Sequence, residues 1–204
     1  MGRRILTTLS LIVLFSLVFY FGIAREVLAL IALLAIIYEV LRFENDGYMG
    51  LVVMVQMMGL FLAPMISNPE LVWLMLIVGA GDVMAIIGGK YLNPFPSLRP
   101  FPEISQGKTV VGYLWGFVAG VGVGWGFNKF WPVPLGGLAF PFIFYFAAAL
   151  GDLSGSKWKR IIGIKDSGEY LWTEKVLPGH GGLVDRFGAL AMALWVWLVL
   201  ESML

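Results

Sequence analysis

The chain has no cysteine, a single histidine and few charged side chains, and each shortage excludes a class of protein. Disulfides and thiolate chemistry need cysteine, and one histidine alone does not make a zinc site. Charged residues account for 13% of the 204 residues, whereas a soluble domain carries about 25%. The chain also has no basic tail, so we expect no nucleic-acid partner.

Apolar residues are abundant instead: they make up 59% of the chain, and the mean hydropathy is +0.86. Several apolar runs are about 17 to 20 residues long, enough for a helix to cross a hydrocarbon core of roughly 30 Å. The sequence therefore predicts an all-α polytopic membrane protein with about seven transmembrane helices and two polar cytoplasmic loops. The predicted spans are Ile5–Gly22, Val27–Leu41, Met49–Ile66, Leu71–Gly89, Val110–Phe127, Val133–Leu150 and Phe187–Leu204.

The first apolar run is interpreted as an uncleaved helix. It is longer than the apolar part of a typical signal peptide, and no small-residue cleavage site follows it. We divide the chain into an N-terminal part, 1–70, with spans one to three, and a catalytic transmembrane domain, 71–204. The second part holds spans four to seven and the two polar loops, 90–109 and 151–186.

The basic residues are distributed unequally between the two sides of the predicted membrane. Seven spans place twelve of the fourteen Lys and Arg residues on one side and leave only Arg25 and Lys129 on the other. Cytoplasmic loops carry such an excess of positive charge. We therefore expect the N-terminus and both polar loops to be cytoplasmic.

The fifth span has glycines at four-residue spacing, Gly112, Gly116 and Gly120, followed by Gly122, Gly124 and Gly126. Small residues at this spacing indicate close helix packing; a glycine-lined ligand groove is the alternative. Such packing permits a homodimer without requiring one.

Two aspartates stand out as candidates for chemistry. Asp82 lies in the fourth span, eight residues before Lys90 and so roughly 12 Å from the end of that helix. A carboxylate at that depth favours a polar intramembrane site, with a structural ion pair as the alternative. Asp152 shares a helical face with Ser156 and Lys159 if the sixth helix continues. This face suits a metal-bridged phosphate, or else a basic helix end on anionic headgroups.

The stretch Gly151–Leu190 is the most polar part of the chain. It contains the pairs Lys165-Asp166 and Asp185-Arg186, and between them a glycine-rich turn around His180. Exposed backbone N–H groups in such a turn can bind an anion, although a lone histidine there is as often structural. These acids and cations at a membrane surface suggest Mg²⁺-dependent chemistry on phosphates, with a lipid as one substrate.

Lys108 lies at a loop-to-helix junction. Gly107-Lys108-Thr109 looks like the end of a phosphate-binding P-loop, but Pro102 stands where that motif needs its first glycine. Lys108 could still bind a phosphate at the start of the fifth span.

Several of these segments together resemble the signature of the phosphatidate cytidylyltransferase, or CDP-diacylglycerol synthase, family. The segments are Gly81-Asp82 with Gly89-Lys90, Ser105-Gln106-Gly107-Lys108-Thr109, Ser156–Arg160, Lys165–Gly168 and Leu177–Arg186. The resemblance covers about residues 75–190, and its Pro-Gly-His-Gly-Gly-x-x-Asp-Arg part is the most specific. Three carboxylates of the family pattern are absent, at Val111, Gly155 and Gly188. The segment between Asp166 and Pro178 is also longer.

The resemblance implies that CTP and phosphatidic acid, or a related lipid phosphate, are converted to CDP-diacylglycerol and pyrophosphate. It implies Mg²⁺, with room for a second cation, held by Asp152, Asp185 and Asp82. The expected catalytic residues are Asp152, Asp185, Lys159, Arg160 and Asp166. The expected substrate-binding residues are Lys90, Ser105, Lys108, Thr109, Ser156, Lys165, His180, Gly181, Gly182 and Arg186.

Two alternatives remain at this point. One is a related CTP-dependent enzyme that acts on another lipid, such as an ether-lipid phosphate or a polyprenol. The other is a non-catalytic or transport protein in which intramembrane acids such as Asp82 and Glu39 line an ion path.

Overall fold

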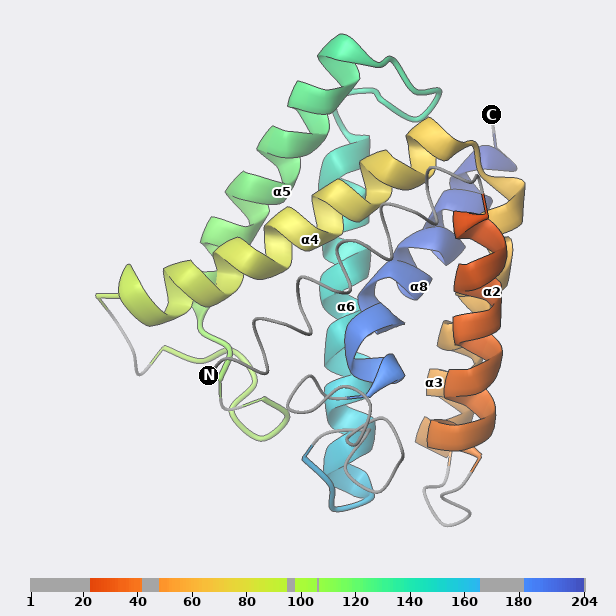
Figure 1. Cartoon of the computed structure of the whole chain (residues 1–204). Helices are drawn as coiled ribbons and strands as arrows, with labels where there is room; N and C mark the ends of the chain where they lie inside the picture. The colour runs from red at the N-terminus through yellow and green to blue at the C-terminus, as the bar shows by residue number, and fades with distance from the viewer. Residues whose placement is uncertain (1–22, 42–47, 95–97, 106, 166–181, 204) are drawn as a thin grey trace, which may run out of the picture.

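The computed structural model describes residues 23–41, 48–94, 98–105, 107–165 and 182–203, and all regular structure in them is helical (Figure 1). The helices are α2 (Ala24–Ala35), α3 (Tyr48–Met58), α4 (Asn68–Tyr91), α5 (Val110–Phe130), α6 (Phe140–Ile161) and α8 (Leu183–Glu201). A π-helical turn, η1 (Ile36–Val40), extends α2, and a 3₁₀ segment, η2 (Gly59–Met65), extends α3.

Four of the described segments are long and apolar enough to cross a membrane, which agrees with the prediction of an integral membrane protein. They are Tyr48–Met65, Asn68–Tyr91, Val110–Phe130 and Leu183–Glu201. Six of the predicted spans overlap helical segments, whereas the first, Ile5–Gly22, lies outside the described residues.

The predicted boundaries of the sixth span and of the second polar loop were wrong. Residues 131–139 form an irregular turn, where Asn128 accepts a hydrogen bond from the Val133 N–H at 2.9 Å and donates one to the Gly136 carbonyl at 2.7 Å. Helix α6 therefore begins later than the predicted span and continues to Ile161. Its last turn carries basic side chains, which interact favourably with the negative end of the helix dipole. Because α8 begins at Leu183, both ends of the predicted loop, 151–161 and 183–186, are helical.

Local signals explain where α4 and α5 begin. The Ser67 hydroxyl accepts from the Glu70 N–H, and the Glu70 carboxylate accepts from the Ser67 N–H, which is a capping box. The Thr109 hydroxyl accepts from the Gly112 N–H at 3.1 Å and starts α5 in the same way.

Helices α4 and α5 pack closely through glycine, as the four-residue spacing predicted. A Cβ at Gly116 would lie 2.6 Å from the Gly81 carbonyl oxygen, and one at Gly112 would lie 2.7 Å from that of Ala85. No larger residue fits at this distance without separating the helices. The outer glycines, Gly122 and Gly126, face open space instead.

The core joins the two ends of the chain. Trp73 of α4 and Phe144 of α6 are fully buried and meet edge to face, with ring centroids 5.5 Å apart. Helix α8 packs along α6, and both also contact α3. Helix α4 crosses in front of α6 (Figure 1), and it also contacts α5 and α8.

Candidate active site

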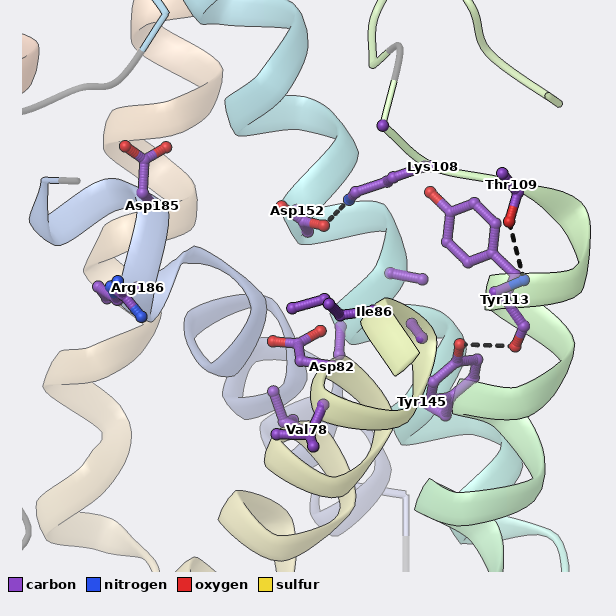
Figure 2. A pocket seen from close by; sticks show the side chains of 16 residues that line it. Val78, Asp82, Ile86, Lys108, Thr109, Tyr113, Tyr145, Asp152, Asp185 and Arg186 are labelled. Atoms are coloured by element: carbon purple, nitrogen blue, oxygen red, sulfur yellow. Dashed lines mark hydrogen bonds and ion pairs between the residues drawn. The ribbon is translucent and has the colours of Figure 1, made fainter. Parts of the chain in front are cut away.

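A cavity of about 370 Å³ lies between α4, α5, α6 and α8. Each of three helices contributes an aspartate to its lining: Asp82 from α4, Asp152 from α6 and Asp185 from α8 (Figure 2). Lys108 and Arg186 supply positive charge, and apolar side chains of α4 form one wall. The chain thus brings together six of the residues predicted for the site, from segments more than a hundred residues apart.

Lys108 and Asp152 form an ion pair across the cavity. The side chain of Lys108 is 26% exposed and that of Asp152 36%, so both can be reached from the cavity. Burial lowers the pKa of the Lys108 ammonium to about 8; the charge of Asp82 opposes this shift, and that of Lys159 adds to it. Lys108 is therefore positively charged in most molecules at neutral pH, next to the carboxylates.

Asp185 is held at the start of α8 by two partners. Its carboxylate pairs with the ammonium of Lys159 from α6, and its second oxygen accepts the Gly182 N–H at 3.2 Å. Both charged side chains are largely buried, 13% exposed for Lys159 and 16% for Asp185. This pair connects the end of α6 to the beginning of α8 and orients the Asp185 carboxylate.

Asp82 of α4 completes the acidic lining of the cavity. It interacts electrostatically with Lys108 and with Arg186, which come from opposite sides of the cavity. The neighbouring apolar side chains Val83 and Ile86 are 56% and 67% exposed. The cavity therefore combines a charged centre with an apolar wall.

Several predicted residues lie elsewhere. Lys90 lies outside the lining, with its ammonium 5.2 Å from the centre of the Tyr91 ring. Ser105, Ser156 and Lys165 also lie outside it. Arg160 donates to the carbonyls of Ile104 and Ile164, so in this structure it ties the end of α6 to the loop before α5.

The remaining predicted residues have structural positions or cannot be placed. Thr109 lines the cavity, but its hydroxyl caps α5, and Gly182 is the N-cap residue of α8. Asp166, His180 and Gly181 lie outside the described residues.

The donor set of the cavity suits a magnesium ion bound together with a substrate. Within the described part of the chain, no group of three or more Asp, Glu or His side chains could hold a metal alone. Magnesium is commonly held by one or two carboxylates, with phosphate oxygens and water completing its coordination. Asp152 and Asp185 line the same cavity and fit this mode of binding.

Comparison with known proteins agrees with this geometry. The model of the cytidylyltransferase family matches residues 47–203, which is most of the chain. The chain belongs to the cytidylyltransferase family.

Relatives within this family carry a more specific name. A phosphatidate cytidylyltransferase of Helicobacter pylori strain J99 is 40% identical over 129 residues, 60% of this chain and 45% of the relative. A Synechocystis protein of the same name is 38% identical over 113 residues, 53% of this chain and 35% of the relative. Phosphatidate cytidylyltransferase 4, chloroplastic, of Arabidopsis thaliana is 36% identical over 110 residues, 52% of this chain and 26% of the relative. The matches thus span less than half the length of these relatives, and no solved structure matches the chain significantly.

Two polar residues near the cavity helices were not predicted as part of the site. Glu39, in η1, is fully buried, and its carboxylate accepts the N–H groups of Leu183 and Val184 at 2.6 and 2.9 Å. Gln56, in α3, is 2% exposed and hydrogen-bonds to α6 and α8. The only sequence signal for Glu39 and for Gln56 was a polar residue within an apolar run. Such a signal does not tell which neighbouring helix the side chain faces.

Two tyrosines also line the cavity without having been predicted. Tyr145 of α6 donates to the Tyr113 carbonyl at 2.8 Å, which joins α5 and α6 (Figure 2). The Lys108 ammonium lies 5.8 Å from the centre of the Tyr113 ring, near the range of a cation–π contact.

Proposed function

We propose that this protein transfers the cytidylyl group of CTP to phosphatidic acid, giving CDP-diacylglycerol and pyrophosphate. The observation that carries the proposal is the cavity itself, which is lined by carboxylates of α4, α6 and α8 together with Lys108 and lies beside an exposed apolar wall. The names of the family's relatives support the same reaction.

In the proposed reaction, a phosphate oxygen of phosphatidic acid attacks the α-phosphorus of CTP. The bond from that phosphorus to the bridging oxygen breaks, and pyrophosphate leaves with the electron pair. The nucleophile is already an anion, so no strong general base is needed. Repulsion between two anionic substrates is the main obstacle, and fixed positive charge in a partly dehydrated site lowers it.

The cations of the cavity would neutralise this charge. Lys108 and Arg186 line the cavity, and Lys159 stands behind Asp185. Asp152 and Asp185 would hold magnesium, which when bound screens the phosphates and orients them for attack. The preorganised pairs Lys108–Asp152 and Lys159–Asp185 keep these side chains in place, which reduces the entropic cost of aligning the substrates.

The apolar wall suits the lipid substrate. Val83 and Ile86 lie on α4 next to Asp82, within a helix that is long and apolar enough to span a membrane. A phosphate at the charged centre with acyl chains along this wall would satisfy both ends of the lipid. An ether-lipid phosphate would fit the same arrangement, so the acceptor should be tested over a panel.

The test is pyrophosphate release from purified protein with labelled CTP, Mg²⁺ and phosphatidic acid. We expect release that requires the lipid, and at least about a 100-fold loss in Asp152→Asn and Asp185→Asn, because each removes a negatively charged ligand. Glu201→Gln, an exposed acid at the far end of α8, is the control and should behave as wild type. Turnover without lipid, or wild-type rates in both aspartate variants, would refute the proposal.

We also propose that the cavity faces the cytoplasm, as the distribution of basic residues predicts, in a protein with seven spans. Lys157 is an exposed residue of α6, and because the chain lacks cysteine, the variant Lys157→Cys would have a single thiol. An impermeant thiol reagent should label it from the cytoplasmic side alone; labelling from the outside would reverse the orientation.

A further inference from the structure

Gln56 connects three helices through one buried side chain. Its amide nitrogen donates to the carbonyl oxygen of Gly151 in α6 at 2.8 Å and to that of Gly188 in α8 at 2.7 Å. Its amide oxygen accepts from the Ser154 hydroxyl, also in α6. A side-chain amide has two N–H donors, and here each goes to a different helix.

The two carbonyls lie where α6 and α8 come closest. A Cβ at Gly151 would lie 2.7 Å from the Gly188 carbonyl oxygen, and one at Gly188 would lie 2.9 Å from the Gln56 amide nitrogen. The two backbones therefore approach closely at these glycines, and the Gln56 amide bridges the contact. This accounts for the glycine at 188, where the family pattern has an acid: a larger side chain would displace the amide.

This crossing is adjacent to the acids of the cavity. Asp152 directly follows Gly151, and Asp185 lies three residues before Gly188, on the same face of α8. At a rise of 1.5 Å per residue, the backbone of each aspartate lies within about 5 Å, measured along its helix, of a carbonyl that accepts a hydrogen bond from Gln56. A rotation or slide at the crossing would therefore change the separation of the two aspartates directly.

We propose that Gln56 is a positioning residue that sets the separation of Asp152 and Asp185 through the α6–α8 crossing. None of its hydrogen-bond partners, Gly151, Ser154 and Gly188, lines the cavity. Its effect on turnover rests on the proposed function, whereas its effect on the distance between the helices does not.

The variant Gln56→Met keeps the size of the side chain and removes both donors. A displacement of about 1 Å at a reacting centre can cost on the order of 100-fold in rate. We therefore expect kcat for CTP to fall by about 10- to 100-fold, while CTP affinity, measured without lipid, changes by less than about threefold. Ser154→Ala removes the hydroxyl that contacts the amide oxygen of Gln56 and the Gly151 carbonyl but keeps both amide donors, so it should shift kcat in the same direction by less.

Trp195→Phe is the matched control for a merely structural role. The Trp195 indole N–H donates to the Val55 carbonyl at 2.8 Å, so it joins the same two helices, α8 and α3, away from the cavity. We expect this variant to lose thermal stability without losing kcat. Equal kcat losses in Gln56→Met and Trp195→Phe, at similar stability, would overturn the proposal.

A second measurement is independent of turnover. Spin labels on Ile161→Cys in α6 and Val199→Cys in α8, both exposed, report the distance between these helices in a chain with no other cysteine. We expect Gln56→Met to shift or broaden the distance distribution and Trp195→Phe to leave it unchanged. An unchanged distribution in Gln56→Met would overturn the proposal. If the wild type shows no lipid-dependent turnover, the proposed function fails, and this distance measurement alone decides the role of Gln56.

Discussion

Replacing Glu39 with glutamine tests how α8 is held. Glu39 is fully buried, and each of its carboxylate oxygens accepts one N–H, from Leu183 at 2.6 Å and from Val184 at 2.9 Å. These N–H groups belong to the first turn of α8, where no helical carbonyl is available to accept them. The carboxylate also places a negative charge at the positive end of the helix dipole.

The cost of Glu39→Gln follows from these contacts. The amide of glutamine has one oxygen, so one of the two N–H groups faces an N–H₂ group and loses its acceptor. A buried donor without an acceptor costs about 1–3 kcal/mol, and losing the charge at the helix end costs up to about 2 kcal/mol more. We expect a loss of about 2–4 kcal/mol, which lowers the melting temperature of a chain of this length by roughly 5–15 °C.

The assay is thermal unfolding in detergent, followed by helical circular dichroism, with turnover measured at a temperature below both transitions. Turnover should also fall, because the residue two positions after Leu183 is Asp185. Glu201→Gln makes the same substitution at the exposed C-terminal end of α8, where removing a negative charge is neutral or slightly favourable. A Glu39→Gln protein that melts within about 2 °C of wild type would refute the capping role, since the expected shift is several times larger.

Three further changes probe the site and its walls. Because Lys108 loses its charge near pH 8, kcat/KM should fall as the pH rises through about 8, and Lys108→Arg should move this decline to higher pH in a pH–rate profile. Lys159→Met leaves the largely buried carboxylate of Asp185 without its cation and should lower stability by about 1–3 kcal/mol in denaturant titrations. Gly116→Ala puts a Cβ 2.6 Å from the Gly81 carbonyl, and we expect it to cost about 1–3 kcal/mol in the same titration.

Local signals in the sequence predicted part of this fold well. The glycine spacing of α5 predicted the close contact with α4, and the predicted fourth span, Leu71–Gly89, lies within α4, which begins at Asn68 after the capping residue Ser67. The start of α6 was missed because it depends on Asn128, whose side chain organises a turn several residues later in the chain. The sequence allowed the sixth helix to continue past Leu150 without requiring it, and α6 does continue to Ile161, because basic side chains are well suited to the last turn of a helix.

The candidate site was predicted through the acids and cations that resemble a known signature. The cavity does collect Asp82, Asp152, Asp185, Lys108 and Arg186. Arg160, by contrast, lies outside its lining and bonds to backbone carbonyls. Spacing along a helix tells which face a side chain occupies, but not which neighbour covers that face, so residues such as Ser156 could not be assigned from the sequence.

Two residues that hold the helices around the site lie outside the segments that resemble the family signature. Glu39 and Gln56 lie in the N-terminal part of the chain, yet they bond to the backbone of α8, and Gln56 also to that of α6. Apolar helices in a bilayer gain little from burying apolar surface against one another, so buried hydrogen bonds contribute strongly to their arrangement. A catalytic cluster that depends on the separation of two carboxylates then depends on whichever side chains hold the crossing helices. In the described part of this chain, Glu39 and Gln56 make such contacts, with Gly151, Leu183 and Gly188. We therefore expect the geometry of the carboxylates to depend on both side chains.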